Sequence, residues 1–554
     1  MTSPARRAIV IGMDGASMEL VQNMIEWGHA PSIKRLAERG VQRAMIGVFP
    51  TLTPPGWTAV ATGSWPGTHN VMDFNNRALG QPLTETEWGI DTRRCKSEYL
   101  WNTVERAGKN PILVKWEMAW PPTVTTGIQV EGTGPGVSNH HQIAGYHLFV
   151  GGKWAPRPIG GDRDPETLDP SALQEGAPFD VVAINPADDW INLPSSSQPP
   201  FEVELVVTPL ARGREDMNRG QVGTPKTYFG LIYASGNQGY DRVRVTVKRD
   251  AARPIADLAA GEWSDWTLDN YEIDGKSLQG YLRLKLITLT PSGDQFELFV
   301  PQIWPTGGDY AVPAGIAEEI AERLGPFIQN PGRDALGFFD DETYFEMMDF
   351  HHQRLGEVAV HLAMTRDWDV LFVESHAPDY ASHFFLAQAD PISGASPATI
   401  ERCRRGLART YESVDLMIAR VLELADEDTV VAIVSDHGGT PNQHRPVDVN
   451  DVLEKAGFVA YRTDAVTDKR EVDLSRTTAL GVGLVHVFIN LKGREPNGTV
   501  DPADYEETQR KIIDALHAFT DPATGRHPFT LAVTHADAEM LNLGGDLVGD
   551  VVYA

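Results

Sequence analysis

Four stretches of the sequence place polar residues that can bind metal ions at the end of an apolar run or directly after it. They are residues 11–15, 49–63, 372–383 and 434–439. Apolar runs of this length are typical of buried parallel strands. Because ligands of α/β sheets bind at the carboxyl ends of the strands, we expect the four stretches to converge on one site.

The acidic and histidine residues of these stretches have a spacing that suits metal binding. Asp379 and His383 are four residues apart and would share one face of a helix. Asp436 and His437 are adjacent, so that their side chains can bridge two ions from the end of one strand. Each feature alone has a simpler interpretation than metal binding. Asp14 before a glycine indicates a turn, and Asp379 with His383 indicates an exposed ion pair. Taken together, the five residues predict a metal centre.

Thr53 is the predicted nucleophile. It lies in the run Thr51-Leu-Thr-Pro-Pro55, where a turn is the simpler interpretation. A threonine hydroxyl is a weak nucleophile, and coordination to a divalent metal lowers its pKa. A second ion ~4 Å away can bind the opposite oxygen of an in-line phosphoryl displacement. The Asp/His ligands suit Zn²⁺, with Mn²⁺ or iron as alternatives. We therefore predict attack by Thr53 and a phosphothreonine intermediate.

These motifs resemble those of the alkaline phosphatase superfamily, specifically its type I phosphodiesterase/nucleotide pyrophosphatase branch. The resemblance covers about residues 6–125 and 355–554. The Thr-x-Thr-x-Pro setting of the family nucleophile matches residues 51–55. The turn Pro66-Gly-Thr-His69 is similar to the family's Pro-x-x-His turn, which we interpret as structural.

The resemblance implies two metal sites and an oxyanion site. The first metal would be bound by Asp14, Thr53, Asp436 and His437, and the second by Asp379 and His383. The backbone N–H of Thr53 and an asparagine would bind the oxyanion. The family's asparagine position is Phe74 in this chain, and Asn75, the next residue, is the predicted catalytic donor.

The second metal of the family takes one more histidine, far along the chain from the Asp-His-Gly motif. The candidates are His444, His486, His527 and His535. His444 follows the motif most closely and is the predicted ligand. His486 lies in an apolar strand, and His527 and His535 flank a turn. The apolar ending Val-Val-Tyr-Ala leads to a further hypothesis, that a second chain supplies the last ligand and strands.

Alternating strands and helices predict a mixed α/β fold. The apolar runs 8–13, 111–116, 370–374, 430–435 and 485–491 predict strands of a parallel-rich sheet flanked by helices, one of them over 398–425. This alkaline-phosphatase-like catalytic domain would comprise residues 1–180 and 311–554. Residues 181–310 contain runs that alternate at period two, which predicts an inserted antiparallel β module. Its Trp263, Trp266 and Tyr271 would pack in a core or bind a leaving group.

Charge and composition limit the classes of partner that the protein can bind and indicate its location. Lys and Arg number 48 against 76 Asp and Glu, a net charge of −28, which disfavours nucleic acid polymers and anionic membranes. No run of apolar residues is long enough to span a bilayer. With only two cysteines and no signal peptide pattern, a cytoplasmic location is expected. A small phosphorylated substrate is the predicted partner, and a homo-oligomer stays open.

The sequence favours cleavage of a phosphodiester or pyrophosphate bond. A dianionic monoester would favour an arginine clamp, and no arginine lies close to Thr53. Lys115 and Arg445 are candidate clamps from elsewhere in the chain. Three alternatives stay open: a phosphomonoesterase, a phosphomutase of the same superfamily, and an inactive hydrolase fold that serves as a scaffold. A sulfatase is excluded because neither cysteine lies in the Cys-x-Pro-x-Arg motif.

Overall fold

A central, mostly parallel sheet organises the chain. The computed structural model describes residues 6–133, 141–154, 179–209, 223–329, 340–441, 447–463 and 470–554. The strand order of the sheet is β18-β5-β4-β19-β1-β20. The strands are β1 (Arg7–Met13), β4 (Pro111–Val114), β5 (Ile128–Val130), β18 (Ala311–Val312), β19 (Val370–Ser375) and β20 (Thr429–Val434). All pairs are parallel except β18 with β5, so five strands present their carboxyl ends at one edge. Four of the predicted runs are thereby confirmed as strands of this sheet.

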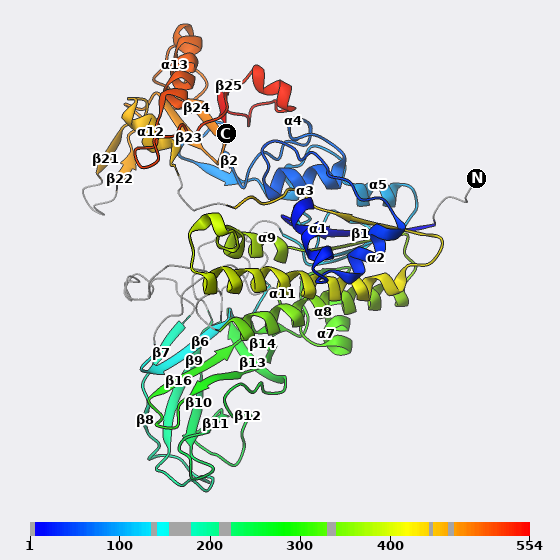
Figure 1. The fold of residues 1–554 in the computed structure, drawn as a ribbon, viewed down its shortest axis with the longest axis vertical. Helices are drawn as coiled ribbons and strands as arrows, with labels where there is room; N and C mark the ends of the chain where they lie inside the picture. The colour runs from blue at the N-terminus through cyan, green and yellow to red at the C-terminus, as the bar shows by residue number, and fades with distance from the viewer. Residues whose placement is uncertain are drawn as a thin grey trace.

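Helices cover both faces of the central sheet, because successive side chains of its strands point to opposite faces and are apolar on both. Ile9 and Ile11 of β1 pack into a core with α8 (Asp341–Thr365) and α11 (Pro397–Val421). Val10 faces the other way, into an aromatic cluster with α3 (Thr53–Thr62) and α5 (Leu100–Arg106). In Figure 1, α8 and α11 lie below the sheet, and α3 and α5 lie above it. The helix predicted over 398–425 is α11, which ends four residues earlier.

Several shorter elements complete this part of the chain. They are α1 (Met18–Glu26), α2 (Pro31–Arg39), α4 (Pro66–His69), β2 (Asn75–Arg77), β3 (Thr86–Trp88), α7 (Ile316–Leu324), α9 (Ala377–Ala381) and α10 (Ala387–Ala389). A buried hydrogen-bond relay supports the end of β19, since His352 of α8 contacts Ser375 Oγ at 2.7 Å and Ser413 Oγ of α11 at 2.8 Å.

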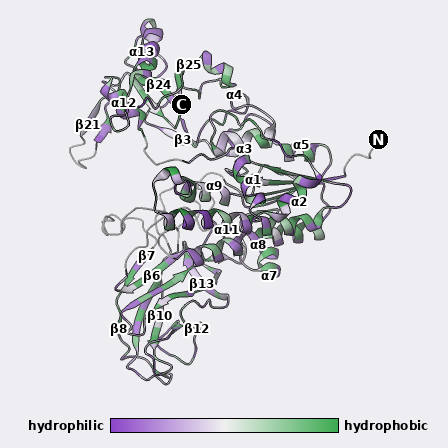
Figure 2. Cartoon of the chain, viewed as in Figure 1, coloured by the Kyte–Doolittle hydropathy of each residue, from purple (hydrophilic) through white to green (hydrophobic). Residues whose placement is uncertain are grey.

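A β-rich module packs against the side of the molecule that α8 forms. Its three sheets have the orders β12-β11-β10-β9-β8, β13-β14-β17 and β15-β16-β6-β7. The strands are β6 (His147–Gly152), β7 (Phe179–Val182), β8 (Asn185–Pro186), β9 (Phe201–Val207), β10 (Lys226–Tyr233), β11 (Arg242–Thr246), β12 (Ala256–Leu258), β13 (Thr267–Ile273), β14 (Lys276–Leu282), β15 (Lys285–Leu289), β16 (Gln295–Val300) and β17 (Trp304–Pro305). Figure 2 shows apolar and polar residues alternating along them. Because β6 pairs with β16, this β structure begins before residue 181.

The aromatic residues of the module serve packing. Tyr271 is 1% exposed. Trp263 donates its indole N–H to Glu346 Oε2 of α8 at 2.7 Å, and the Trp266 ring packs on Phe350 of the same helix. Trp263 and Trp266 therefore fasten the module to α8, in agreement with the core interpretation.

The C-terminal part forms a separate antiparallel sheet, of order β23-β24-β26-β25. It comprises β23 (Ala479–Val482), β24 (His486–Ile489), β25 (Ala532–Thr534) and β26 (Val551–Tyr553), with α12 (Val449–Lys455), α13 (Tyr505–Ala518) and the hairpin of β21 (Tyr461–Thr463) and β22 (Arg470–Val472). The expectation that the 485–491 run joins the parallel sheet is wrong, because it pairs with β23 and β26 here. The apolar β26 lies between β24 and β25, and this double pairing accounts for its character.

Among the described residues, none of the helices combines the length and the apolar character that a membrane crossing needs. Cys95 and Cys403 are both free thiols.

The stability of the C-terminal sheet should depend on pH through His486, which is 2% exposed. Burial, aided by His535, lowers the pKa of His486 to about 4, against ~6.5 in the unfolded chain. Below pH ~6.5 the unfolded chain therefore binds a proton that the native protein does not, and stability is lost as the pH falls. Between pH 7.5 and 5.0 this loss amounts to about 2 kcal/mol.

His486→Gln should remove this contribution while keeping an acceptor for the Gly549 N–H, which lies 3.3 Å from His486 Nδ1. Urea unfolding at pH 7.5 and 5.0 measures the effect. We expect the wild type to lose more free energy of unfolding than the variant. Equal losses in the two proteins would show that His486 titrates normally.

Candidate metal centre

The predicted site residues meet at the carboxyl edge of the central sheet. Asp14 follows β1, Asp379 lies in α9 just after β19, and Asp436 and His437 follow β20. Thr53 is the first residue of α3. The convergence expected from the strand ends is therefore observed for these five residues.

Two glycines allow this close approach. Gly15 has φ +64°, and a Cβ there would lie 2.8 Å from the Asp379 Cα. A Cβ on Gly56, in the first turn of α3, would lie 2.9 Å from the Asp436 Cβ. Real Cβ atoms do not approach so closely, so glycine at these positions lets β1 and α3 bring Asp14 and Thr53 against the other strand ends.

The first group of the centre comprises Asp14, Thr53, Asp436 and His437. His437 Nε2 lies 3.2 Å from Thr53 Oγ1, 3.3 Å from Asp436 Oδ2 and 3.5 Å from Asp14 Oδ1. Ligand atoms at the corners of a tetrahedral zinc site are ~3.4 Å apart, given zinc–ligand bonds of about 2.0–2.2 Å. The three distances from His437 Nε2 are therefore those expected inside one metal site, and ligand atoms of Asp14, Asp436 and His437 all lie within 4.8 Å of one another.

The carboxylates of this group lack the partners that burial demands. Asp14 is 0% and Asp436 3% exposed. Asp14 Oδ2 accepts the Trp57 indole N–H at 2.7 Å, and Asp436 Oδ1 accepts the Gly15 N–H at 3.2 Å. The other oxygen of each, Asp14 Oδ1 and Asp436 Oδ2, has no hydrogen-bond partner in the described part of the chain. An unpaired buried carboxylate is costly, so these residues fit a cation.

Electrostatics lead to the same conclusion. Burial, followed by the charge of Asp14, raises the pKa of Asp436 well above its usual range. The same two causes raise the pKa of Asp379. The charge of Asp14 thus disfavours the ionised forms of Asp436 and Asp379, and divalent cations would offset this effect.

The second group comprises the predicted pair Asp379 and His383, and His376 lies beside Asp379. Asp379 Oδ2 lies 3.4 Å from His383 Nε2 and 3.6 Å from His376 Nε2. His376 was not among the predicted ligands, although it directly follows β19 and precedes Asp379 by three residues. Its Nδ1 lies 2.7 Å from Asp14 Oδ2, so it also contacts the first group. Its position immediately after a strand that ends at the site is the sequence feature that could have identified His376 as a residue of the centre.

Lys115 is engaged in a buried charge cluster next to the centre. Its Nζ lies 3.2 Å from Glu117 Oε1 and 3.7 Å from Glu374 Oε2, and the residue is 3% exposed. Burial raises the pKa of Glu131, which completes the cluster, to about 8. Lys115 therefore neutralises carboxylates inside the protein, and the expectation that it could clamp a substrate phosphate is wrong.

Asn75 and His444 are not brought to the centre by any described contact. Asn75 is exposed in β2, where it pairs with Trp88 and its backbone N–H points to Asp73 Oδ1. Within the described residues, no hydrogen bond or ion pair joins its side chain to Thr53, and its oxyanion role stays a prediction. His444 and Arg445 lie outside the described residues.

The other histidine candidates have structural surroundings. His486 and His535 contact the backbone of Gly549 within the C-terminal part, and His527 contacts the Phe519 carbonyl at 2.9 Å. His69 is buried in the α4 turn, where its Nδ1 accepts the Val71 N–H at 3.1 Å.

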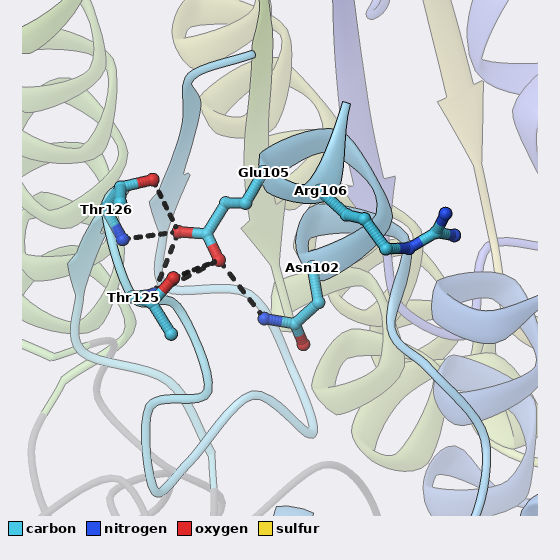
Figure 3. Close-up of a pocket in the computed structure, with 5 residues that line it drawn as sticks. All are labelled: Asn102, Glu105, Arg106, Thr125 and Thr126. Carbon is cyan, nitrogen blue, oxygen red and sulfur yellow. Dashed lines mark hydrogen bonds between the residues drawn. The ribbon is translucent and has the colours of Figure 1, made fainter. Parts of the chain in front are cut away.

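A surface pocket lies at the opposite edge of the sheet, where β4 and β5 begin (Figure 3). It is lined by Asn102, Glu105, Arg106, Thr125 and Thr126. The Glu105 carboxylate accepts backbone N–H groups of Thr125, Thr126 and Gly127 at 2.7–3.1 Å. It thus fixes the loop before β5, and the pocket has no part in the metal centre.

Comparisons with known proteins give one family match and two similar solved structures. Residues 8–199 and 297–552 match the family model of type I phosphodiesterase/nucleotide pyrophosphatase. No curated protein sequence matches the chain significantly. Two solved structures of phosphonoacetate hydrolase from Sinorhizobium meliloti 1021, with phosphonoformate and with phosphonoacetate, are 12% identical and cover 100% of this chain and 81% of theirs. Their TM-scores are 0.40 and 0.41, a likeness that carries no argument about activity.

Proposed function

This chain belongs to the type I phosphodiesterase/nucleotide pyrophosphatase family and is a hydrolase of phosphoric ester bonds, and on that premise we propose that it cleaves a phosphodiester or pyrophosphate bond with Thr53 as nucleophile. The observation that carries the proposal is the position of the Thr53 hydroxyl. It lies 3.2 Å from His437 Nε2, inside the first group, at the N-terminus of α3.

The start of α3 suits an oxyanion. Residues at helix N-termini leave backbone N–H groups without partners and carry partial positive charge. Pro54 and Pro55 follow Thr53 and have no N–H, so Thr53 supplies the backbone donor of this first turn. The same residue thus presents both the attacking hydroxyl and a donor for a phosphoryl oxygen.

The metal ligands are proposed as two sets. Asp14, Thr53, Asp436 and His437 would hold one divalent ion, and Asp379 with His383 a second, with Zn²⁺ as the best fit to Asp/His ligands. Such ions, when bound, lower the pKa of a hydroxyl and neutralise charge that develops on phosphoryl oxygens.

The proposed reaction takes two displacements at phosphorus. Thr53 Oγ1 forms a bond to phosphorus as the bond to the leaving oxygen breaks, and the threonine proton is lost to solvent while the leaving alcohol or phosphate takes one up. Water then forms the new bond to phosphorus, the Thr53 ester bond breaks, and the hydroxyl regains a proton. The chain's residues hold the nucleophile and bind the oxyanion in both steps.

The charges around the centre support a diester over a monoester. Lys115 is committed to Glu117 and Glu374, and in the described part of the chain no arginine forms an ion pair with the site carboxylates. A dianionic monoester would need such a clamp more than a monoanionic diester does.

We also propose that the β module, expected at residues 181–310, is an insertion in the catalytic domain and that it begins before residue 181, because β6 pairs with β16 and β7. The family match is interrupted between residues 199 and 297, inside the β module, which supports this division.

Hydrolysis of bis-p-nitrophenyl phosphate and p-nitrophenyl phosphate, each with Zn²⁺ or Mn²⁺, tests the proposed function. We expect a higher kcat/KM for the diester. A higher value for the monoester would instead favour a phosphomonoesterase or phosphomutase. No turnover of either ester by metal-loaded protein would favour a scaffold on an inactive hydrolase fold.

A further inference from the structure

Trp57 connects the helix of the proposed nucleophile to an aspartate of the centre. The residue is 0% exposed and lies in α3 four positions after Thr53, so the two side chains share one face of the helix. Its indole N–H donates a hydrogen bond of 2.7 Å to Asp14 Oδ2, directly after β1. This bond joins the two elements that carry Thr53 and Asp14 of the first group.

Strand β1 makes room for this indole ring. A Cβ on Gly12 would lie 2.7 Å from Trp57 Cη2, closer than real Cβ atoms approach, so glycine at this position admits the ring against the strand. Trp57 also packs edge-on against Trp116, with ring centroids 5.1 Å apart. The strand and the aromatic cluster thus fix the place from which the indole N–H reaches Asp14.

The hydrogen bond divides the two carboxylate oxygens of Asp14 between the fold and the centre. Oδ2 accepts the indole N–H and also lies 2.7 Å from His376 Nδ1. Oδ1 has no hydrogen-bond partner among the described residues and lies 3.5 Å from His437 Nε2, within the first group. Hydrogen bonds from surrounding residues orient metal-binding carboxylates in this manner and are needed for full metal affinity.

We propose that Trp57 is a positioning residue of the reaction, whose indole N–H holds Asp14 with Oδ1 toward the ion of the first group. This inference rests on the proposed function and deepens it. Because Trp57 and Thr53 belong to the same helix, the bond also sets where the attacking hydroxyl lies relative to Asp14. Trp57 acts through Asp14 and needs no contact with the substrate.

The competing interpretation is that Trp57 is a core residue whose N–H merely finds an acceptor. The chain contains a matched residue for this comparison. Trp101 is 0% exposed in the same aromatic cluster, and its indole N–H donates to Thr123 Oγ1, also at 2.7 Å. Trp57→Phe and Trp101→Phe therefore remove the same atoms from one cluster and differ in whether the lost hydrogen bond ends at the metal centre.

Zinc affinity, measured by competition with a chromogenic chelator, separates the two interpretations. We expect Trp57→Phe to lose roughly 10- to 100-fold in Zn²⁺ affinity and Trp101→Phe to bind Zn²⁺ as the wild type does. At saturating Zn²⁺, kcat for bis-p-nitrophenyl phosphate should fall in Trp57→Phe with little change in KM, because Asp14 and Thr53 serve the chemical step. Thermal unfolding should show similar losses of stability in both variants. Equal zinc affinity and kcat in Trp57→Phe and Trp101→Phe would overturn the proposal.

A second substitution keeps the ring and removes the donor alone. In β-(3-benzothienyl)alanine a sulfur atom replaces the indole N–H, so its incorporation at position 57 leaves the packing against Gly12 and Trp116 in place. We expect the same loss of zinc affinity as in Trp57→Phe, and no loss when the analogue is at position 101. Wild-type zinc affinity with the analogue at position 57 would sink the proposal, even if Trp57→Phe did not fold.

The outcomes also distinguish this inference from the proposed function. Zinc affinity is measured without substrate, so it decides the role of Trp57 even if the wild type cleaves neither ester. If the wild type cleaves the diester but Trp57→Phe matches Trp101→Phe in both measurements, only the role of Trp57 fails. If the wild type binds no metal at all, the proposed function fails and this inference fails with it.

Discussion

Replacing Thr53 by alanine is expected to lower kcat/KM for the diester by roughly 10⁴-fold or more, as loss of a covalent nucleophile does in other hydrolases. The physical reason is that Thr53 Oγ1 is the hydroxyl held within the first group, 3.2 Å from His437 Nε2. Steady-state hydrolysis of bis-p-nitrophenyl phosphate measures the effect. Since Asp14, Asp436 and His437 remain as ligands in this variant, metal content should stay near that of the wild type.

Two neighbouring substitutions serve as controls for Thr53→Ala. Thr53→Ser keeps a hydroxyl at the same position and should retain most of the activity. Thr51→Ala changes an exposed threonine two residues earlier and should leave kcat/KM unchanged. If Thr53→Ala were as active as Thr51→Ala, a different group, such as a water molecule, would have to attack phosphorus.

Asp436→Asn should be more stable than the wild type without metal and should gain less stability when Zn²⁺ is added. Asp436 Oδ2 is buried, near the equally buried Asp14, and has no hydrogen-bond partner among the residues that the structure describes. In chelator-treated protein, the asparagine removes one buried negative charge, so the variant should be more stable than the wild type by on the order of 1–3 kcal/mol. With Zn²⁺ added, the wild type should gain more stability than the variant, because the ion binds the native carboxylate.

Thermal unfolding of both proteins, with a chelator and with Zn²⁺, measures this crossover. Asp188→Asn, which changes an exposed aspartate of the β module, is the control and should follow the wild type under both conditions. An Asp436→Asn protein that is less stable than the wild type even without metal would indicate that Asp436 is stabilised by the fold itself. The buried carboxylates would then be no sign of a cation.

Much of the catalytic edge could be predicted because it depends on local patterns. The runs that became β1, β4, β19 and β20 are continuously apolar, as strands covered on both faces must be. Once these strands are parallel, their carboxyl ends meet, so that Asp14, Asp379 and Asp436 converge without further information. Thr53 follows in the same way, because the prolines after it favour the start of a helix.

The rest depends on tertiary contacts that sequence spacing does not encode. The run at β24 is as apolar as the central strands, and only its partners β23 and β26 place it in an antiparallel sheet. Lys115 looks like a free cation in the sequence, whereas Glu117 and Glu374 bury it. His376 gains its importance from Asp14, a residue on a different strand and distant in sequence.

The central claim, that Thr53 becomes covalently phosphorylated, is tested most directly by acid quenching during turnover. Metal-loaded protein is mixed with excess bis-p-nitrophenyl phosphate, quenched within one turnover and digested, and the peptide containing residues 49–63 is examined by mass spectrometry. We expect a p-nitrophenyl phosphoryl group on Thr53 of the wild type and on the serine of Thr53→Ser. The peptide of Thr53→Ala should carry none. An active, metal-loaded enzyme whose peptide is never modified at any quench time would contradict covalent catalysis by Thr53.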